Sequence, residues 1–364
     1  MKTLVIGGTG PTGHFIVNGL LERGHAVAIL HTGRHEVAEI PTQVEHIHTD
    51  PFDGGALAAA LAGRTFDLTI ATYGRLRSTC EVMVGKTARF ISIGGVPAYR
   101  GYSNPAVLTP NGLPVPIAEG SPKSTDRSED EKGYRVFRSE GVVFDHHPTA
   151  THFRYPLVYG PYQLVPREWC IVRRIRDRRP FIVLADGGLT LHHCGYAENI
   201  AHAVLLAVDE PDVAAGQVYN CADADALTLR QVVDVVADAL GHRWDVVSMP
   251  YELAACARPL VAQPTNTHRV FDLSKLKSEL GYADVVPARE AFARTARWLI
   301  EHQPRPGGPE ERNLQDPFDY AAEDRLVGAW RRTLAAFPNV SYATEPGYTS
   351  AYSGPGAPTR KGSW

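Results

Sequence analysis

The first 24 residues constrain the fold more than any other stretch of the chain. A short apolar run, Thr3 to Ile6, is typical of a parallel strand buried on both faces. Three glycines follow in the spacing G-x-x-G-x-x-G, at Gly7, Gly10 and Gly13, and then comes a helical apolar pattern that ends at Gly24. Glycine lets backbone amides approach a pyrophosphate, and a helix N-terminus attracts negative charge. The stretch therefore predicts a dinucleotide-binding turn; the alternative is a tight turn without a ligand.

Composition excludes several other classes of protein. The 364 residues are 44% hydrophobic, which is enough for a sizeable core and two lobes. A net charge of −3 gives no reason to expect nucleic acid or a membrane surface as a partner. Five cysteines without C-x-x-C spacing, an opening apolar run too short for a secretory signal and no bilayer-spanning segment predict a cytoplasmic protein with reduced thiols. None of the fifteen histidines lies in H-E-x-x-H spacing, so no metal site is predicted.

Strand and helix patterns alternate after the glycine turn. Strands are expected at residues 26–31, 44–48, 66–71 and 89–93, with a short helix at 56–61. This alternation predicts an α/β fold with a Rossmann-type, doubly wound parallel sheet, a smaller α/β substrate lobe and a C-terminal extension.

The end of the second strand bears on the choice of cofactor. An acid there accepts hydrogen bonds from the ribose of NAD, whereas a basic residue accommodates the 2′-phosphate of NADP. The segment after His31 has Thr32 and a cation, Arg34, and no acid before Glu36. NADP is therefore predicted, with NAD as the alternative; a solvated Arg34 is the other interpretation.

The order of motifs resembles the extended short-chain dehydrogenase/reductase family, which includes NAD-dependent epimerases and dehydratases. The resemblance is carried by the glycine turn, Asp50, the R-Y-P-L-V-Y-G-P run at 154–161, Y-A-E-N-I-A at 196–201 and the 272–282 segment. It implies a dinucleotide-binding Rossmann domain at 1–162 with a loop insertion at 100–132, a partly interleaved substrate lobe at 163–302 and an arm at 303–364.

The resemblance also assigns cofactor contacts. Asp50 would contact the adenine, Thr72 and Tyr73 the ribose and phosphates, and Tyr155 and Pro156 the nicotinamide. The full set of expected cofactor-binding residues is Gly7, Thr9, Gly10, Pro11, Thr12, Gly13, Thr32, Arg34, Asp50, Pro51, Thr72, Tyr73, Gly94, Tyr155 and Pro156.

The family's catalytic set is only partly matched. It consists of a serine or threonine after the fifth strand and a Tyr-x-x-x-Lys motif on the next helix, where tyrosine moves the proton and lysine lowers its pKa. Here the serine position falls on Gly94-Gly95. One register uses arginine in place of lysine, which changes the geometry; a second register is set by Glu140. The two registers offer Tyr134 with Arg138, or Lys132 with Val136, and the catalytic candidates are Tyr134, Lys132 and Arg138.

Three further segments have two interpretations each. The proline-rich insertion at 100–132 is either an ordered flap over the site or a mobile surface loop. The arginine-rich helix expected at 167–179 is either an anion subsite or a solvated basic face. A histidine at His192 or His193 either faces the substrate as an acid or base or is simply packed.

The C-terminal arm carries an apolar stripe. A helix is expected at 319–337, after a Pro- and Gly-rich link. We expect its apolar face to pack on the substrate lobe or on a second subunit, so a homodimer is one alternative.

Three functions are consistent with the sequence. The first is an NADP(H)-dependent oxidoreductase acting on a hydroxyl or carbonyl carbon of a small polar metabolite, with an anionic substrate as one alternative. The second is a redox-neutral epimerase or dehydratase with tightly bound NAD(P). The third is a nucleotide-binding regulatory protein that has lost catalysis.

Overall fold

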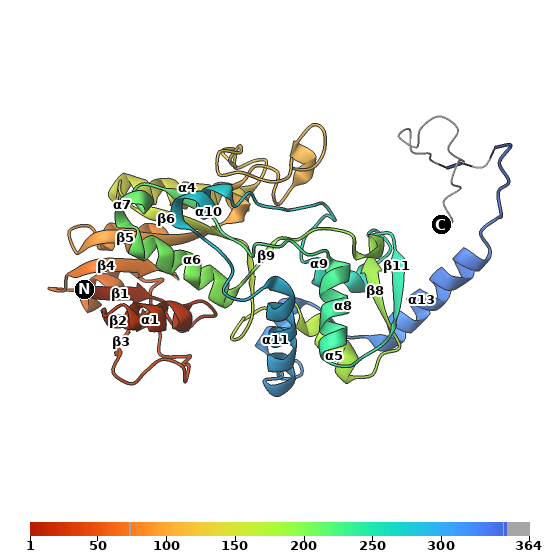
Figure 1. Ribbon diagram of the computed structural model, residues 1–364, viewed down its shortest axis with the longest axis horizontal. Coiled ribbons are helices and arrows are strands. Elements are labelled where there is room, and N and C mark those ends of the chain that lie inside the picture. The colour runs from red at the N-terminus through yellow and green to blue at the C-terminus, as the bar shows by residue number, and fades with distance from the viewer. Residues whose placement is uncertain (73, 345, 348–364) are drawn as a thin grey trace, which may run out of the picture. The chain divides into compact units, whose positions relative to one another are not determined.

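A seven-stranded parallel sheet forms the centre of the N-terminal part of the chain (Figure 1). The computed structural model describes residues 1–72, 74–344 and 346–347. The strands lie in the order β10-β6-β5-β4-β1-β2-β3. Their bounds are β1 (Lys2–Ile6), β2 (Ala26–His31), β3 (Glu45–His48), β4 (Phe66–Ala71), β5 (Thr87–Gly95), β6 (Thr151–Tyr155) and β10 (Val218–Asn220). The prediction of a doubly wound Rossmann-type sheet is confirmed.

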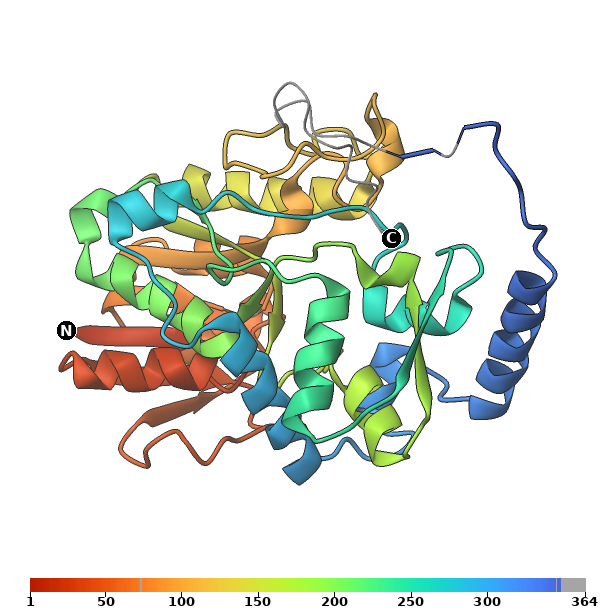
Figure 2. The same cartoon turned by 45° about the vertical axis from the view of Figure 1, so that its right-hand side comes forward.

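Helices cover both faces of this sheet (Figure 2). One face packs on α1 (Gly13–Glu22) and α6 (Ala197–Asp209), and the other on α2 (Gly54–Ala60), α3 (Leu76–Val82) and α4 (Glu131–His146). Within β1, Val5 belongs to the first core cluster, and Leu4 and Ile6 to the second. Because successive strand residues point to opposite faces, a strand covered on both sides needs apolar side chains at every position.

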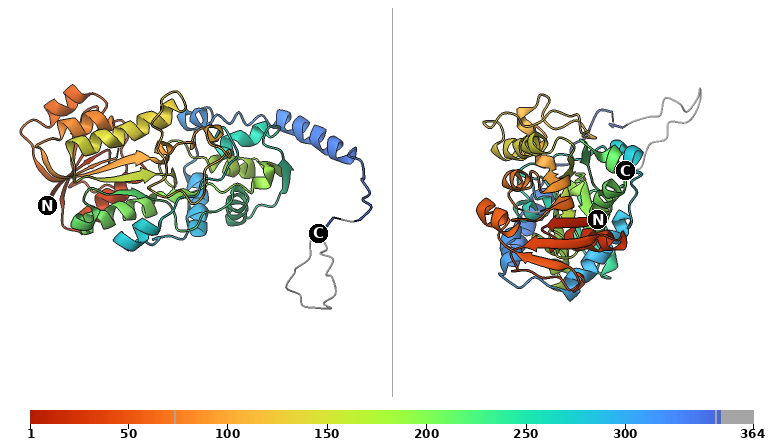
Figure 3. Two further views of the ribbon diagram at one scale, coloured as in Figure 1. Left: turned by 90° about the horizontal axis from the view of Figure 1, so that it is seen from above. Right: turned by 90° about the vertical axis from the view of Figure 1, so that its left-hand side faces the viewer.

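A second lobe lies beyond the carboxyl ends of the strands (Figures 1 and 3). Two short parallel strand pairs, β8 with β11 and β7 with β9, belong to it. Its elements are β7 (Leu157–Tyr159), α5 (Trp169–Arg176), β8 (Phe181–Ala185), β9 (Cys194–Tyr196), α8 (Leu229–Ala239), β11 (Asp245–Met249), α9 (Arg258–Val261), α11 (Ala288–Glu301) and α12 (Pro309–Leu314). Helices α7 (Pro211–Ala214) and α10 (Ser274–Leu280) contact α6, and α10 also contacts β10; the interleaved domain organisation stays a prediction.

The insertion at 100–132 is packed against the second lobe. Tyr102 and Ile117 are buried in one apolar cluster with Phe271, and Ile117 forms a parallel β-bridge with Phe271. Tyr99 bridges Lys123 at the base of the insertion. These contacts favour the interpretation as an ordered segment; a role in covering the ligand stays a prediction.

Local sequence signals set several element ends. The bounds of β2 and β4 agree with the prediction. Thr228 begins α8 with a complete capping box in which the Gln231 side chain accepts a hydrogen bond from the Thr228 backbone amide. The main difference is β5, which continues through Gly94-Gly95 instead of ending at Ile93.

The chain divides into two compact units, 1–317 and 318–364. The second contains α13 (Tyr320–Ala335), inside the helix predicted at 319–337. Its packing on the substrate lobe or on a second subunit stays a prediction. No helix among the described residues has the length and apolar content needed to cross a membrane.

Candidate functional site

The glycine turn between β1 and α1 is folded back on itself. Gly7 and Gly8 have φ values of 111° and 91°, a region that favours glycine. A Cβ added at Gly13 would lie 2.4 Å from the carbonyl oxygen of Gly8, so only glycine fits there. By contrast, a Cβ added at Gly10 would meet nothing within 4 Å. The protein therefore leaves space in front of Gly10, next to the amide groups that begin α1.

The adenosine end of the predicted site lies at the ends of β2 and β3. Thr32, Arg34 and Asp50 are exposed there. The carboxylate of Asp50 accepts a hydrogen bond from the Phe52 amide at 2.9 Å. Pro51 is buried. These positions are compatible with the predicted contacts but do not test them.

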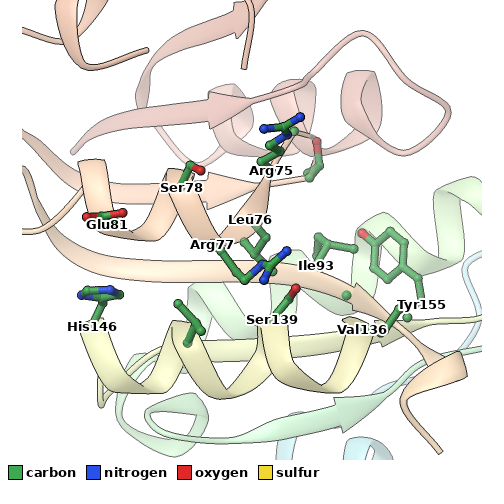
Figure 4. A pocket seen from close by; sticks show the side chains of 15 residues that line it. Arg75, Leu76, Arg77, Ser78, Glu81, Ile93, Val136, Ser139, His146 and Tyr155 are labelled. Carbon is green, nitrogen blue, oxygen red and sulfur yellow. The ribbon is translucent and has the colours of Figure 1, made fainter. Parts of the chain in front are cut away.

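A cleft of about 900 Å³ opens at the carboxyl ends of β4 and β5, between α3 and α4 (Figure 4). Three predicted cofactor residues line it: Thr72, Gly94 and Tyr155. Tyr73 lies outside the described residues. The charged and polar lining side chains that sequence reasoning missed are Arg75, Arg77, Ser78, Glu81, Ser139 and His146. Neither Arg75 nor Arg77 has a carboxylate partner among the residues described, and the cleft also contains one acid, Glu81.

The hydroxyl group of Tyr155 is buried and has no hydrogen-bond partner among the described residues. Burial raises the pKa of this phenol far above its usual range, and nearby Thr12 only partly offsets the rise. The phenol is therefore neutral at any physiological pH. An orphaned buried donor that lines a cleft is a feature expected where a ligand completes the site.

A buried ion pair anchors α4 to the sheet. Arg154 on β6 donates two hydrogen bonds to the carboxylate of Glu140 on α4, at 2.9 and 2.6 Å. Arg154 also donates to the Tyr99 hydroxyl at 2.8 Å, and this hydroxyl donates to Asn220 at 2.6 Å. Because the two charged side chains are almost completely buried, this contact fixes the rotation of α4.

Comparison with known proteins shows which fold this is. UDP-glucose 4-epimerase from Thermotoga maritima, solved with UDP-glucose, superposes with a TM-score of 0.66 at 16% identity, over 84% of this chain and 100% of that one. WbmG of Bordetella bronchiseptica, solved with NAD, gives 0.65 at 17% identity over 83% and 94% of the two chains. The dTDP-glucose 4,6-dehydratase DesIV of Streptomyces venezuelae gives 0.64 at 20% identity over 83% and 98%. The chain has the fold of the extended short-chain dehydrogenase/reductase family.

The sequence relatives include an uncharacterized protein and a named enzyme. The uncharacterized protein YbjS of Escherichia coli is 25% identical over 345 residues, which covers 83% of this chain and 98% of that protein. An Arabidopsis thaliana 3beta-hydroxysteroid-dehydrogenase/decarboxylase is 27% identical over 168 residues, 38% of this chain and 29% of that protein. No protein-family model matches the chain.

The register set by Glu140 is the second of the two predicted for the family's catalytic motif. In that register Lys132 and Val136 lie eight and four residues before Glu140, and Val136 lines the cleft. Tyr134 is half-buried, Lys132 and Arg138 are exposed, and none of the three lines the cleft. The helical periodicity of Val136, Ser139 and His146 would have identified this face from the sequence.

His152 explains why the family's serine position is glycine. Its Nδ1 lies 2.7 Å from the Ser92 hydroxyl and its Nε2 lies 3.5 Å from the carboxylate of Glu140. A Cβ added at Gly94 would lie 2.4 Å from that Nε2. The imidazole thus fills the volume that a side chain at 94 would need, because β6 runs beside β5 with His152 opposite Ser92.

The buried state of His152 predicts a pH dependence of stability. Burial lowers its pKa to about 4, below the value of 6.5 in an unfolded chain. The unfolded chain therefore binds the extra proton first, and stability is full above pH 6.5 and is lost as the pH falls toward 4. Between pH 7.5 and pH 5 we expect this histidine to remove about 2 kcal/mol from the free energy of unfolding.

Urea unfolding at the two pH values measures this loss. In His152→Gln the difference between pH 7.5 and pH 5 should shrink, whereas exchange of the exposed His35 for glutamine should leave it as in the wild type. An unchanged difference in His152→Gln would show that other groups control acid stability.

A second group of unsatisfied polar atoms lies in the substrate lobe. Both ring nitrogens of His192 and Nη1 of Arg167 are buried without partners among the described residues. Arg167 and Arg269 both lie close enough to lower the pKa of His192, which burial reduces to about 3. Two buried guanidinium groups beside a neutral imidazole form a site suited to an anion. His192 lies two residues before β9, and Tyr155 lies two residues before β7, the strand that pairs with β9.

Two arginines of the arginine-rich helix form ion pairs within the protein, which neither prediction described. Arg173 forms an ion pair with Glu311 at 2.6 Å, and Arg174 is buried against Asp316 at 2.7 Å. These arginines join α5 to the segment around α12, so they are structural. It is Arg167, just before α5, that carries an unsatisfied donor.

Proposed function

We propose that the protein is an NADP(H)-dependent oxidoreductase that acts on a hydroxyl or carbonyl carbon of a small, polar, anionic metabolite. The observation that carries the proposal is the glycine turn. Protein atoms fill the space beside Gly13, whereas the space in front of Gly10 is free of protein atoms. The cleft at the carboxyl ends of β4 and β5 is lined by Tyr155, whose hydroxyl group has no partner among the described residues. When bound, the nicotinamide nucleotide would supply a hydride donor or acceptor.

NADP is supported by the charges at the end of β2. Glu36, the first acid after this strand, lies within 3.3 to 3.7 Å of nitrogen atoms of three histidines and is therefore already engaged. Arg34 is exposed, and its side chain has no partner among the described residues. A 2′-phosphate would thus meet a cation and no available carboxylate. NAD stays the alternative, and the WbmG and DesIV structures both contain NAD.

Different residues of the chain would then bind the cofactor, transfer the proton and bind the substrate. The amides around Gly10 and Thr12 hold the diphosphate, and the neutral Tyr155 hydroxyl donates a hydrogen bond to the bound ligand. Lys132 stands where the family's tyrosine stands in the register set by Glu140, so we assign proton transfer to its ammonium group, with Tyr134 and Arg138 as the alternatives. Arg167 and Arg269 bind the anionic part of the substrate.

A redox-neutral epimerase or dehydratase that retains NAD(P) is the second candidate. The anion site around His192 favours it, because the UDP-glucose in the Thermotoga maritima epimerase structure carries a diphosphate that would suit such a site. Purified protein that carries NAD(P) and does not consume added NADPH would favour this second function over the first.

Gly10→Ala tests the cofactor site with little risk to the fold. The added methyl group meets no protein atom within 4 Å, and the φ of Gly10 lies outside the region reserved for glycine, so the variant should fold. We expect its affinity for NADPH to fall at least about tenfold, because the methyl group takes the place of the diphosphate. Calorimetric titration of NADPH and NADH measures the change and the preference between the two nucleotides.

Gly141→Ala is the matched control. Gly141 lies on the exposed side of α4, and its added Cβ also meets nothing within 4 Å. This variant should bind NADPH as the wild type does. The proposal fails if the wild-type protein binds neither nucleotide, or if Gly10→Ala binds NADPH as well as Gly141→Ala does.

A further inference from the structure

Three histidines and a glutamate converge at the edge of the sheet, away from the cleft. His31 ends β2, His46 and His48 lie on β3, and Glu36 lies on the loop that joins these strands. One candidate ligand atom from each residue falls in a group whose members all lie within 4.8 Å of one another. The three imidazole rings also stand nearly perpendicular in pairs, at 72°, 89° and 87°.

The strand register produces this convergence. β2 and β3 are parallel neighbours, with His31 opposite His48 and Ile29 opposite His46. His46 and His48 are two residues apart, so their side chains point to the same face of the strand. No metal site is predicted from the sequence, because none of the histidines lies in H-E-x-x-H spacing. Fourteen residues separate His31 from His46, so the cluster does not form a short motif. The pair H-x-H on a strand, beside a histidine that ends the preceding strand, is the signal that identifies the cluster.

We propose that His31, Glu36, His46 and His48 form a binding site for a divalent zinc ion. Four ligands from imidazole and carboxylate are a set that zinc accepts, in tetrahedral geometry with bonds of about 2.0–2.2 Å. That geometry requires ligand atoms roughly 3.3 Å apart. The distances from the Glu36 carboxylate to His46 Nδ1, His48 Nε2 and His31 Nε2 are 3.3, 3.6 and 3.7 Å, so only small rotations are needed.

Charge and burial suit a cation at this place. Zinc binds imidazole, and the side chain of His31 is only 5% exposed, so one of the four ligands lies on the inner side of the cluster. The side chains of His46, Glu36 and His48 are progressively more open to solvent, which provides a path for the ion. Glu36 would supply the single negative charge.

Metal binding also changes the proton positions in the cluster. His31 Nδ1 accepts a long hydrogen bond of 3.3 Å from the Gly33 amide, so in the metal-free protein its proton lies on Nε2, which donates to His46 Nδ1 at 3.1 Å. To bind zinc through Nε2, His31 must carry its proton on Nδ1 instead, at the cost of that long bond. The ion would then tie the loop that carries Glu36 to β3.

Zinc titration of the full chain tests the proposal. The protein is first treated with a chelator, and zinc chloride is then added in competition with a chromophoric chelator. We expect one zinc ion per chain, and an absorption band typical of tetrahedral cobalt when cobalt replaces zinc. His48→Gln and Glu36→Gln, which change exposed side chains and should fold normally, should each weaken zinc binding at least about tenfold.

His35→Gln is the matched control, because His35 lies on the same loop but outside the cluster. It should bind zinc as tightly as the wild type. Zinc should also raise the unfolding temperature of the wild type and of His35→Gln, but not that of Glu36→Gln. The proposal is overturned if the wild type binds no stoichiometric zinc, or if Glu36→Gln and His48→Gln bind it as tightly as His35→Gln. None of these readouts depends on enzyme activity or on the nicotinamide nucleotide.

Discussion

Glu140→Ala is expected to lower the free energy of unfolding by about 3–5 kcal/mol, because it leaves the guanidinium group of Arg154 buried without its counter-ion. Arg154 is only 2% exposed, and both of its bonds to Glu140 are charge-assisted and shorter than 3 Å. The remaining partners of Arg154, the Tyr99 hydroxyl and the Glu119 carbonyl, are uncharged and do not neutralise it. Equilibrium unfolding in urea, monitored by tryptophan fluorescence, measures the loss.

Glu131→Ala is the control for this variant. Glu131 lies on the same helix and forms ion pairs with Arg127 and Arg135, at 2.6 and 2.8 Å, but all three side chains are exposed. Solvent already screens these charges, so the free energy of unfolding should change little. If Glu140→Ala proved no more harmful than Glu131→Ala, the buried pair would not be what holds α4 in register.

The dinucleotide half of the fold could be predicted because its signals are local. The run Thr3 to Ile6, the glycines and the helix pattern after them occupy consecutive residues, and each is dictated by the strand or turn in which it lies. The same holds for the capping box that begins α8 at Thr228. Such features can be predicted without knowing which strands are neighbours in the sheet.

The catalytic half could not be predicted with the same certainty, because it depends on contacts between distant residues. Two registers of α4 fit the sequence, and the contact that anchors this helix joins Glu140 to Arg154 across a helix and a strand. The anion site around His192 likewise combines Arg167, before α5, with Arg269, in a loop about a hundred residues later. Side-chain identity suggested each of these groups, but only the packing of the lobe brings them together.

Gly94→Ser, which restores the residue type of the family's catalytic set, is expected to destabilise the protein by about 3 kcal/mol and not to restore the standard site. The new Cβ would lie 2.4 Å from Nε2 of His152, and the imidazole cannot withdraw easily because Ser92 holds its other nitrogen at 2.7 Å. Overpacking of this kind forces either the side chain or the backbone of β5 out of place. Urea unfolding of the single variant measures the cost.

A double-mutant cycle separates this steric conflict from any general intolerance of β5. His152→Ala alone should also be destabilising, because it leaves a cavity and removes the partner of the Ser92 hydroxyl. In the double variant the serine enters the space that the imidazole has left, so its loss of stability should be smaller than the sum of the two single losses by about 1–3 kcal/mol. Simple additivity would mean that His152 does not occupy the serine's volume. With the predicted coupling, the imidazole of His152 on β6 is what excludes a side chain at position 94.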